Sequence, residues 1–315
     1  MARPLTIAKS AWIYARLFRL PNLLIVVLTQ YLLVFLVLFP AYGRHDISPA
    51  LTAPEFFLLS LTTVVIVAAG YLINDLFDEP IDRINKPDRQ VIGARVPTSV
   101  ARRWYSILFF GGLLIALYLA ATTHNLPLLV LYPLAFGLLW LYSRHFKKQL
   151  LIGNLVVAFF CAFVAGIVWV AERPAIELLR LRASEEAWRL SWILGSYMVF
   201  AFLSTWYREL IKDLEDEEGD RRGHCRTLPI LYGRKAAKVV AAFLAVALLL
   251  LLLLLYDKVW TPGPSLRPIL LSVIAAPILL SLIWLYRARK PGHFHRLSSL
   301  VKFVMLTGLL LLFFL

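Results

Sequence analysis

The acidic residues of this 315-residue chain are concentrated in two short segments. Twelve of the 19 aspartates and glutamates fall between positions 75 and 88 or between positions 209 and 220. Carboxylates grouped in this way can bind hard divalent cations, because Mg²⁺ takes one or two carboxylates together with phosphate oxygens and water. The simpler alternative is that each segment is the solvated, hydrophilic end of a helix.

The spacing within each segment follows a helical face. Asn74, Asp78 and Asp82 are four residues apart, which places them along one side of a helix. The three aspartates of the second segment have the i, i+3, i+7 spacing of a single face. Carboxylates on one face repel each other unless cations lie between them. The expected Mg²⁺ ligands are Asn74, Asp75, Asp78, Asp82, Asp213, Asp216 and Asp220.

The two segments are related to each other by an internal repeat. Residues 73–78 match residues 211–216 at five of six positions when Asn74 and Lys212 are counted as polar for polar. The same offset aligns Asp82 with Asp220. A duplicated pattern favours a shared metal-binding role over two unrelated helix ends, and it predicts two related helical halves.

Basic residues adjoin both segments. Most of them are explained by the tendency of Lys and Arg to collect in cytoplasmic loops. Lys212 is the exception, because it lies within the acidic motif at the repeat position of Asn74. A cation in that place can neutralise the charge that builds up on a departing diphosphate.

The elements that position these segments are helices that cross a membrane. Hydrophobic residues make up 60% of the chain, charged residues only 17%, and the mean hydropathy is +0.75. A soluble domain has about 45–50% apolar and about 25% charged residues. The net charge of +14 is therefore attributed to loops at the membrane surface, and no nucleic acid partner is expected.

Nine apolar runs are long enough to span a bilayer, which predicts an all-α, polytopic membrane protein. Counted with their flanking residues, loops on one side carry 26 Lys and Arg and loops on the other side carry 7, so we expect a cytoplasmic N-terminus and an external C-terminus. An external helix is expected over 172–189. The whole of 1–315 is interpreted as one transmembrane domain, with halves at roughly 1–150 and 151–315. The nine runs cover residues 20–39, 54–73, 104–121, 126–142, 151–171, 190–210, 239–256, 266–286 and 300–315.

These motifs resemble those of UbiA-type intramembrane prenyltransferases. The run from Asn74 to Asp82, followed by Asn85, Lys86, Pro87 and Arg89, looks like the first aspartate motif of that family, and the run from Lys212 to Asp220, followed by 226–229, resembles the second. The sequence departs from the family pattern at Gln90, where members usually have a proline. The resemblance extends over essentially the whole chain and implies nine helices around a central cavity open to lipid.

The resemblance also implies a reaction and roles for individual residues. An isoprenyl group would pass from an isoprenyl diphosphate to a lipophilic acceptor in the membrane, with Mg²⁺ as cofactor and no obligate protein partner. The residues expected to act in catalysis are Lys212, Asp78 and Asp216. Those expected to bind substrate are Asn22, Asn74, Arg89, Lys147, Lys212 and Arg226.

The acceptor and the function class have alternatives. Residues 208–220 look most like the branch of the family that prenylates geranylgeranylglycerol phosphate, whereas hydroxybenzoate or naphthoate acceptors of quinone biosynthesis are the alternative. A secondary transporter is the main alternative of another class, but transporters carry ionisable groups near the membrane midplane. In this chain Glu55, Glu209 and Lys302 lie near the ends of the predicted spans. The expected location is the plasma membrane of a bacterium or an archaeon.

Overall fold

The computed structural model describes residues 7–85, 90–255 and 267–314. Within these ranges all regular secondary structure is helical, with no β-strand and a single isolated bridge between Ile92 and Val96. Helices are the expected outcome for long apolar runs, because a helix satisfies its backbone hydrogen bonds within one segment. The predicted all-α fold is confirmed.

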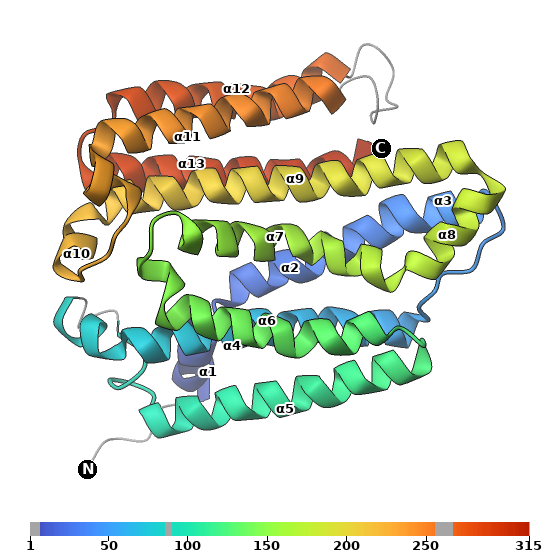
Figure 1. Ribbon diagram of the computed structural model, residues 1–315, viewed down its shortest axis with the longest axis horizontal. Coiled ribbons are helices and arrows are strands. Elements are labelled where there is room, and N and C mark those ends of the chain that lie inside the picture. Colours follow the sequence, from blue (N-terminus) through green and yellow to red (C-terminus); the bar gives the residue numbers. More distant parts are fainter. Residues whose placement is uncertain (1–6, 86–89, 256–266, 315) are drawn as a thin grey trace. The chain divides into compact units, whose positions relative to one another are not determined.

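The helices form two compact units (Figure 1). The first unit holds the described residues up to Leu28 together with Leu51–Phe146. The second holds Thr29–Ala50 and the described residues from Lys147 onwards. The unit boundary near residue 147 lies close to the predicted boundary between halves, although Thr29–Ala50 belong to the second unit. The internal repeat and the single domain stay predictions.

The first unit contains α1 and the start of α2, followed by three long helices. Pro127 lies in the first turn of the last of them, where its missing N–H is tolerated. The bounds in the first unit are α1 Ile7–Leu17, α2 Leu20–Leu33, α4 Ala53–Asn85, α5 Thr98–Thr122 and α6 Leu126–Arg144.

The second unit continues α2 through a π-helical segment, Val34–Leu38, into a short helix, and then contains seven further helices. The predicted external helix over 172–189 corresponds to α8 and the first turns of α9, although its side of the membrane stays a prediction. The bounds are α3 Phe39–Gly43, α7 Ile152–Ala171, α8 Arg173–Arg182, α9 Ser184–Glu215, α10 Glu217–Arg222, α11 Leu228–Leu255, α12 Arg267–Arg287 and α13 Pro291–Leu310.

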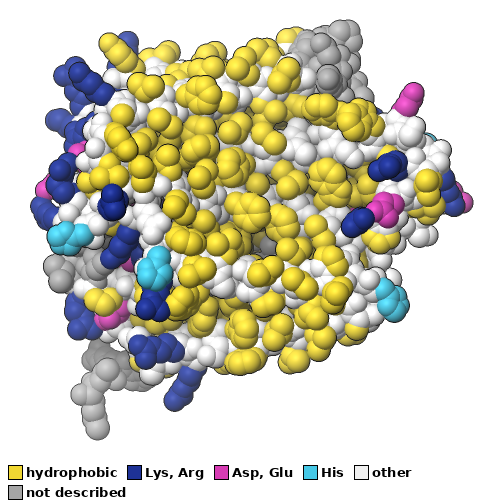
Figure 2. Space-filling view, in the orientation of Figure 1, with side chains coloured by type: hydrophobic (Ala, Val, Ile, Leu, Met, Phe, Trp, Pro, Cys, Tyr) yellow, Lys and Arg dark blue, Asp and Glu magenta, His cyan; other side chains and the backbone are white. Residues whose placement is uncertain are grey.

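Each of the nine predicted spans falls on a long helical stretch of the described residues. By length and composition, seven of these stretches are able to cross a membrane. In α12 the apolar part is shorter, Leu271–Arg287, and α9 does not reach the same hydropathy. For these two helices, crossing of the membrane stays a prediction. The side chains on the face shown in Figure 2 are largely hydrophobic, as expected of helices in contact with lipid.

Close packing of small residues joins α7 to α9 in the second unit. The buried face of α7 includes Ala158, Ala162 and Gly166. A Cβ added at Gly166 would lie 2.9 Å from the Met198 side chain of α9. Small residues allow helix backbones to approach closely in membrane proteins. This contact determines which polar residues at the ends of α7 and α9 can meet.

In the first unit, Gly112 of α5 lies against α6, and a substitution there tests how closely the two helices are packed. A Cβ at this position would overlap Tyr132 Oη, whose hydroxyl donates hydrogen bonds to the carbonyl oxygens of Leu108 (2.8 Å) and Phe109 (3.1 Å). We predict that Gly112→Ala destabilises the protein by about 1–3 kcal/mol, because overpacking displaces the tyrosine. The melting temperature in detergent should fall.

Gly111→Ala is the matched control. No atom lies within 4 Å of a Cβ built at Gly111, and alanine favours a helix over glycine by roughly 0.5–1 kcal/mol. The melting temperature of this variant should therefore be unchanged or slightly higher. Equal melting temperatures for the two alanine variants would contradict the proposed packing constraint.

Candidate functional site

The first acidic segment lies on the last turns of α4. As predicted, Asn74, Asp75 and Asp78 are on one continuous helix, which extends to Asn85. The Asn74 side-chain amide donates a hydrogen bond to Asp78 Oδ2 at 2.9 Å. This contact orients both side chains along the helix and leaves the Asn74 carbonyl oxygen as the atom suited to a metal.

The junction of α1 and α2 lies against this segment. Arg19 forms an ion pair with Asp75 at 2.9 Å, and its guanidinium lies 4.4 Å from the centre of the Tyr71 ring. Asn22 donates a hydrogen bond to Tyr71 Oη at 3.1 Å. Asn22 is thus placed beside Tyr71, which is one helical turn before Asp75 on α4. Sequence reasoning did not identify Arg19 as a residue of this site.

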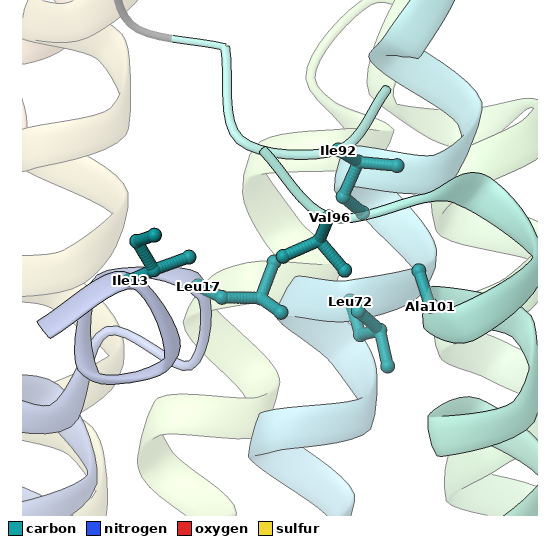
Figure 3. Close-up of a cluster of buried hydrophobic side chains, with 6 residues drawn as sticks. All are labelled: Ile13, Leu17, Leu72, Ile92, Val96 and Ala101. Atoms are coloured by element: carbon teal, nitrogen blue, oxygen red, sulfur yellow. The ribbon is translucent and has the colours of Figure 1, made fainter. Parts of the chain in front are cut away.

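Buried side chains hold these elements together. Figure 3 shows six of them: Ile13 and Leu17 of α1, Leu72 of α4, Ile92 and Val96 of the following loop, and Ala101 of α5. Because Leu72 is two residues before Asn74, burial of this cluster fixes the end of α4 that carries the carboxylates. These hydrophobic contacts therefore position the polar residues of the first acidic segment.

The loop after α4 is tied back to that helix. Gln90 is buried and donates a hydrogen bond to the Glu79 backbone carbonyl at 3.3 Å. Gly93 has a φ of 84°, and a Cβ there would lie 2.7 Å from Glu79 Oε1. A proline at position 90 would have no side-chain donor, so Gln90 supplies a contact that the usual family residue lacks. The Asp82 side chain and the whole of Arg89 lie outside the described residues.

The second acidic segment starts on α9 and continues onto α10. Here the prediction of one helical face is wrong, because α9 ends at Glu215 and Asp216 has φ −92° and ψ 5° between the two helices. Asp213 therefore lies on α9, Asp216 at the junction and Asp220 on α10. Asp216 directly precedes the first turn of α10, a position that aspartate favours, and aspartate is a weaker helix former than glutamate, which fits a break at this residue.

Asp213 is held by an asparagine from another helix. Asn154, in the first turn of α7, donates its side-chain amide to Asp213 Oδ2 at 2.7 Å. Burial raises the pKa of Asp213 to about 7, against the lowering effect of this hydrogen bond, and the nearby carboxylates of Glu209 and Asp220 add to the increase. A cation bound there would compete directly with the proton.

Lys212 lies beside this carboxylate and is itself fixed. Its Nζ contacts both carboxylate oxygens of Glu209, at 2.9 and 3.2 Å. Glu209 is also 3.3 Å from an Arg208 guanidinium nitrogen. The Lys212 side chain remains 40% exposed, so its ammonium is both oriented and accessible to an anion. Sequence reasoning counted Glu209 in the second acidic segment and used its position against a transporter, but it gave neither Glu209 nor Asn154 a role in orienting Lys212 or Asp213.

Two basic loops adjoin the second segment. The Arg226 backbone N–H donates a hydrogen bond to the Lys148 carbonyl oxygen at 2.8 Å, which links the loop before α7 to the loop before α11. The Cys225 N–H donates to the Asp220 carbonyl oxygen at 2.9 Å. Arg226 and the turn that contains Lys147, residues 146–148, are thus brought to the same end of the second unit as Asp220.

The donor set fits Mg²⁺ but not a metal held by protein side chains alone. Among the described residues no group of three or more His, Cys, Asp or Glu side chains is arranged to hold an ion. Mg²⁺ requires only one or two carboxylates when substrate phosphates and water complete its octahedron. Carboxylates held by amide donors, such as Asp78 and Asp213, meet that requirement.

Comparison with known proteins gives consistent results. Residues 31–306 match the model of the UbiA prenyltransferase family. A digeranylgeranylglyceryl phosphate synthase from Methanothermobacter thermautotrophicus is 31% identical over 290 residues, covering 92% of this chain and 90% of that protein.

Solved structures share the fold. One, described as giving insights into digeranylgeranylglyceryl phosphate synthase in membranes, has a TM-score of 0.65 at 23% identity and covers 96% of this chain and 97% of that chain. A UbiA homolog from Archaeoglobus fulgidus bound to DMAPP and Mg²⁺ has a TM-score of 0.55 at 16% identity, with coverage of 95% and 98%.

The Asn154 contact generates a prediction about metal binding. In Asn154→Leu, Asp213 loses the hydrogen bond that lowers its pKa, so the carboxyl should be protonated at neutral pH and bind Mg²⁺ poorly. We predict that the Mg²⁺ concentration needed to stabilise the protein rises about 10–100-fold, as for other residues that orient a metal ligand. Melting temperature measured against Mg²⁺ concentration, with pyrophosphate present, reports this shift.

Gln149→Leu is the control for that measurement. Gln149 is exposed and lies five residues before Asn154, so the same gain in side-chain hydrophobicity should leave the Mg²⁺ requirement unchanged. An unaltered Mg²⁺ requirement in Asn154→Leu would show that the hydrogen bond has no part in metal binding.

Proposed function

Since this chain belongs to the UbiA prenyltransferase family, we propose that it transfers an isoprenyl group from an isoprenyl diphosphate to a lipophilic acceptor, with Mg²⁺ as cofactor. The observation that carries the proposal is the pair of acidic segments, each with an aspartate whose carboxylate is oriented by an asparagine amide. Carboxylates held in this way suit a metal-bound diphosphate.

The two segments have the same proposed role. Asn74, Asp75, Asp78 and Asp82 would hold the Mg²⁺–diphosphate in the first, with Asp213, Asp216 and Asp220 in the second. When bound, Mg²⁺ offsets the negative charge of the diphosphate. The duplicated sequence pattern supports a common role, and the positions at helix ends keep the carboxylates out of the hydrocarbon core.

Lys212 has the proposed role of stabilising the leaving diphosphate. Its ammonium is oriented by Glu209, and a preorganised cation is effective because it needs no rearrangement as charge develops. Asp78 and Asp216 would hold the Mg²⁺ whose charge offsets that of the diphosphate. Asn22, Arg89, Lys147 and Arg226 are proposed to bind substrate.

For the acceptor we propose a geranylgeranylglyceryl phosphate. Support comes from the acidic run over 208–220 and from relatives named as digeranylgeranylglyceryl phosphate synthases. The excess of Lys and Arg in alternate loops supports a cytoplasmic N-terminus and an external C-terminus. The proposed location is the plasma membrane of a prokaryote.

The test supplies purified protein in lipid with labelled geranylgeranyl diphosphate and a panel of acceptors, with products identified by mass. We expect prenylated geranylgeranylglyceryl phosphate, no product in EDTA, and recovery on addition of Mg²⁺. A product formed only with hydroxybenzoate or naphthoate would overturn the proposed acceptor. Full activity in excess EDTA would overturn the metal role.

Lys212 and Arg222 give a matched pair of variants. Lys212→Ala should lower turnover about 10²–10³-fold, because it removes a charge-assisted contact that strengthens in the transition state. Arg222 is paired with Glu218 on the exposed surface of α10, so Arg222→Ala should change turnover only slightly. Lys212→Arg keeps the charge with another geometry and should retain partial activity.

Turnover of the three variants is measured at saturating isoprenyl diphosphate. Equal and small losses for Lys212→Ala and Arg222→Ala would mean that Lys212 is one more basic residue of a cytoplasmic loop.

A further inference from the structure

Lys148 and Arg226 come together where two loops of the second unit are joined. The Arg226 N–H to Lys148 carbonyl hydrogen bond joins the loops directly. The contact from Cys225 to Asp220 ties one loop to α10, and the Asn154 to Asp213 hydrogen bond ties the start of α7, just after the other loop, to α9. These three contacts place both basic residues beside the second acidic segment.

The two side chains differ from four other basic residues around this segment. Lys212 is paired with Glu209, Arg221 with Glu217 and Arg222 with Glu218, while Arg234 is paired with Glu217. Within the part of the chain that the structure describes, the side chains of Lys148 and Arg226 form no ion pair and no hydrogen bond. Two positive charges are therefore available at a place that the fold fixes.

We propose that Lys148 and Arg226 bind the phosphate group of the acceptor, a phosphomonoester on a lipophilic alcohol. The inference rests on the proposed function, which brings two phosphorylated substrates to one enzyme. A phosphomonoester carries a charge of about −1.5 to −2 at neutral pH, which two cations balance. Arg226 can bind phosphate oxygens in bidentate fashion, and Lys148 adds a point charge.

Electrostatics explains why the phosphomonoester would bind to cations and the metal-bound diphosphate to carboxylates. A diphosphate with bound Mg²⁺ is attracted to aspartates because the metal reverses the local sign of charge. A phosphomonoester without metal is repelled by the same aspartates and needs unpaired cations at their edge. Lys148 and Arg226 meet this need, whereas Arg221 and Arg222 are already neutralised by glutamates of α10.

The test measures KM for both substrates in the double variant Lys148→Gln/Arg226→Gln. We expect the KM for geranylgeranylglyceryl phosphate to rise at least about tenfold, since two charge-assisted contacts to its phosphate are lost. The KM for geranylgeranyl diphosphate should stay within about twofold, because the metal-bound substrate is held elsewhere. A rise in the diphosphate KM alone would overturn the proposal.

Two further variants separate a specific site from a general loss of charge or fold. Arg221→Gln/Arg222→Gln removes the same charge from neighbouring positions and should leave the acceptor KM unchanged within about twofold. Lys148→Arg/Arg226→Lys keeps both charges and should retain most of the acceptor affinity. An equal rise in acceptor KM for the Arg221/Arg222 variant would overturn the site assignment.

Competition identifies the chemical group that is recognised. Dodecyl phosphate should compete with the acceptor in the unmodified protein and lose this effect in the Lys148/Arg226 variant, whereas dodecanol and inorganic phosphate at the same concentration should not compete. Inhibition by inorganic phosphate equal to that by dodecyl phosphate would overturn recognition of a lipid-linked phosphate.

Binding of dodecyl phosphate, measured by calorimetry, tests the phosphate site even if the proposed acceptor is wrong. If the protein prenylates only a phosphate-free aromatic acceptor, the product identified by mass overturns the proposed acceptor. Dodecyl phosphate binding that is lost in the Lys148/Arg226 variant would still support the phosphate site, and equal binding by both proteins would overturn it.

Discussion

The hydrocarbon core of the membrane excludes unpaired charge, and this constraint governs where the protein can carry out chemistry. Ionised side chains within a bilayer are costly, whereas helix ends reach water. Both acidic segments accordingly lie at the ends of long helices, α4 and α9, beyond their apolar runs. The membrane-embedded parts then provide an apolar environment for an isoprenyl tail, and the ends provide the polar chemistry.

An asparagine amide contacts an aspartate in both acidic segments, but the two aspartates do not align in the sequence. In the first segment, Asn74 and Asp78 are one turn apart on α4. In the second, Lys212 aligns with Asn74, and Asn154 of α7 donates its amide to Asp213, which aligns with Asp75 and not with Asp78. The two segments are therefore chemically distinct, because the second has an ammonium group and an amide donor from another helix.

The packing of α7 against α9 makes the contact between Asn154 and Asp213 possible. Small residues such as Ala162 and Gly166 let the helices approach, and the first turn of α7 then reaches the last turns of α9. The loops that flank these helices carry Lys148 and Arg226, which are joined through backbone hydrogen bonds. Apolar contacts deep in the second unit therefore set the positions of polar groups at its end.

The helical fold, the family and the two acidic segments could be predicted from sequence, because run length, spacing and clustered carboxylates are local features of the chain. The break between α9 and α10 was missed because the helical spacing of the aspartates does not reveal that Asp216 lies between two helices, at the position before α10 that aspartate favours. The roles of Asn154 and Glu209, and the meeting of Lys148 with Arg226, depended on tertiary structure. Asn154 and Asp213 are 59 residues apart in the chain, and only the packing of α7 on α9 brings their side chains within hydrogen-bonding distance.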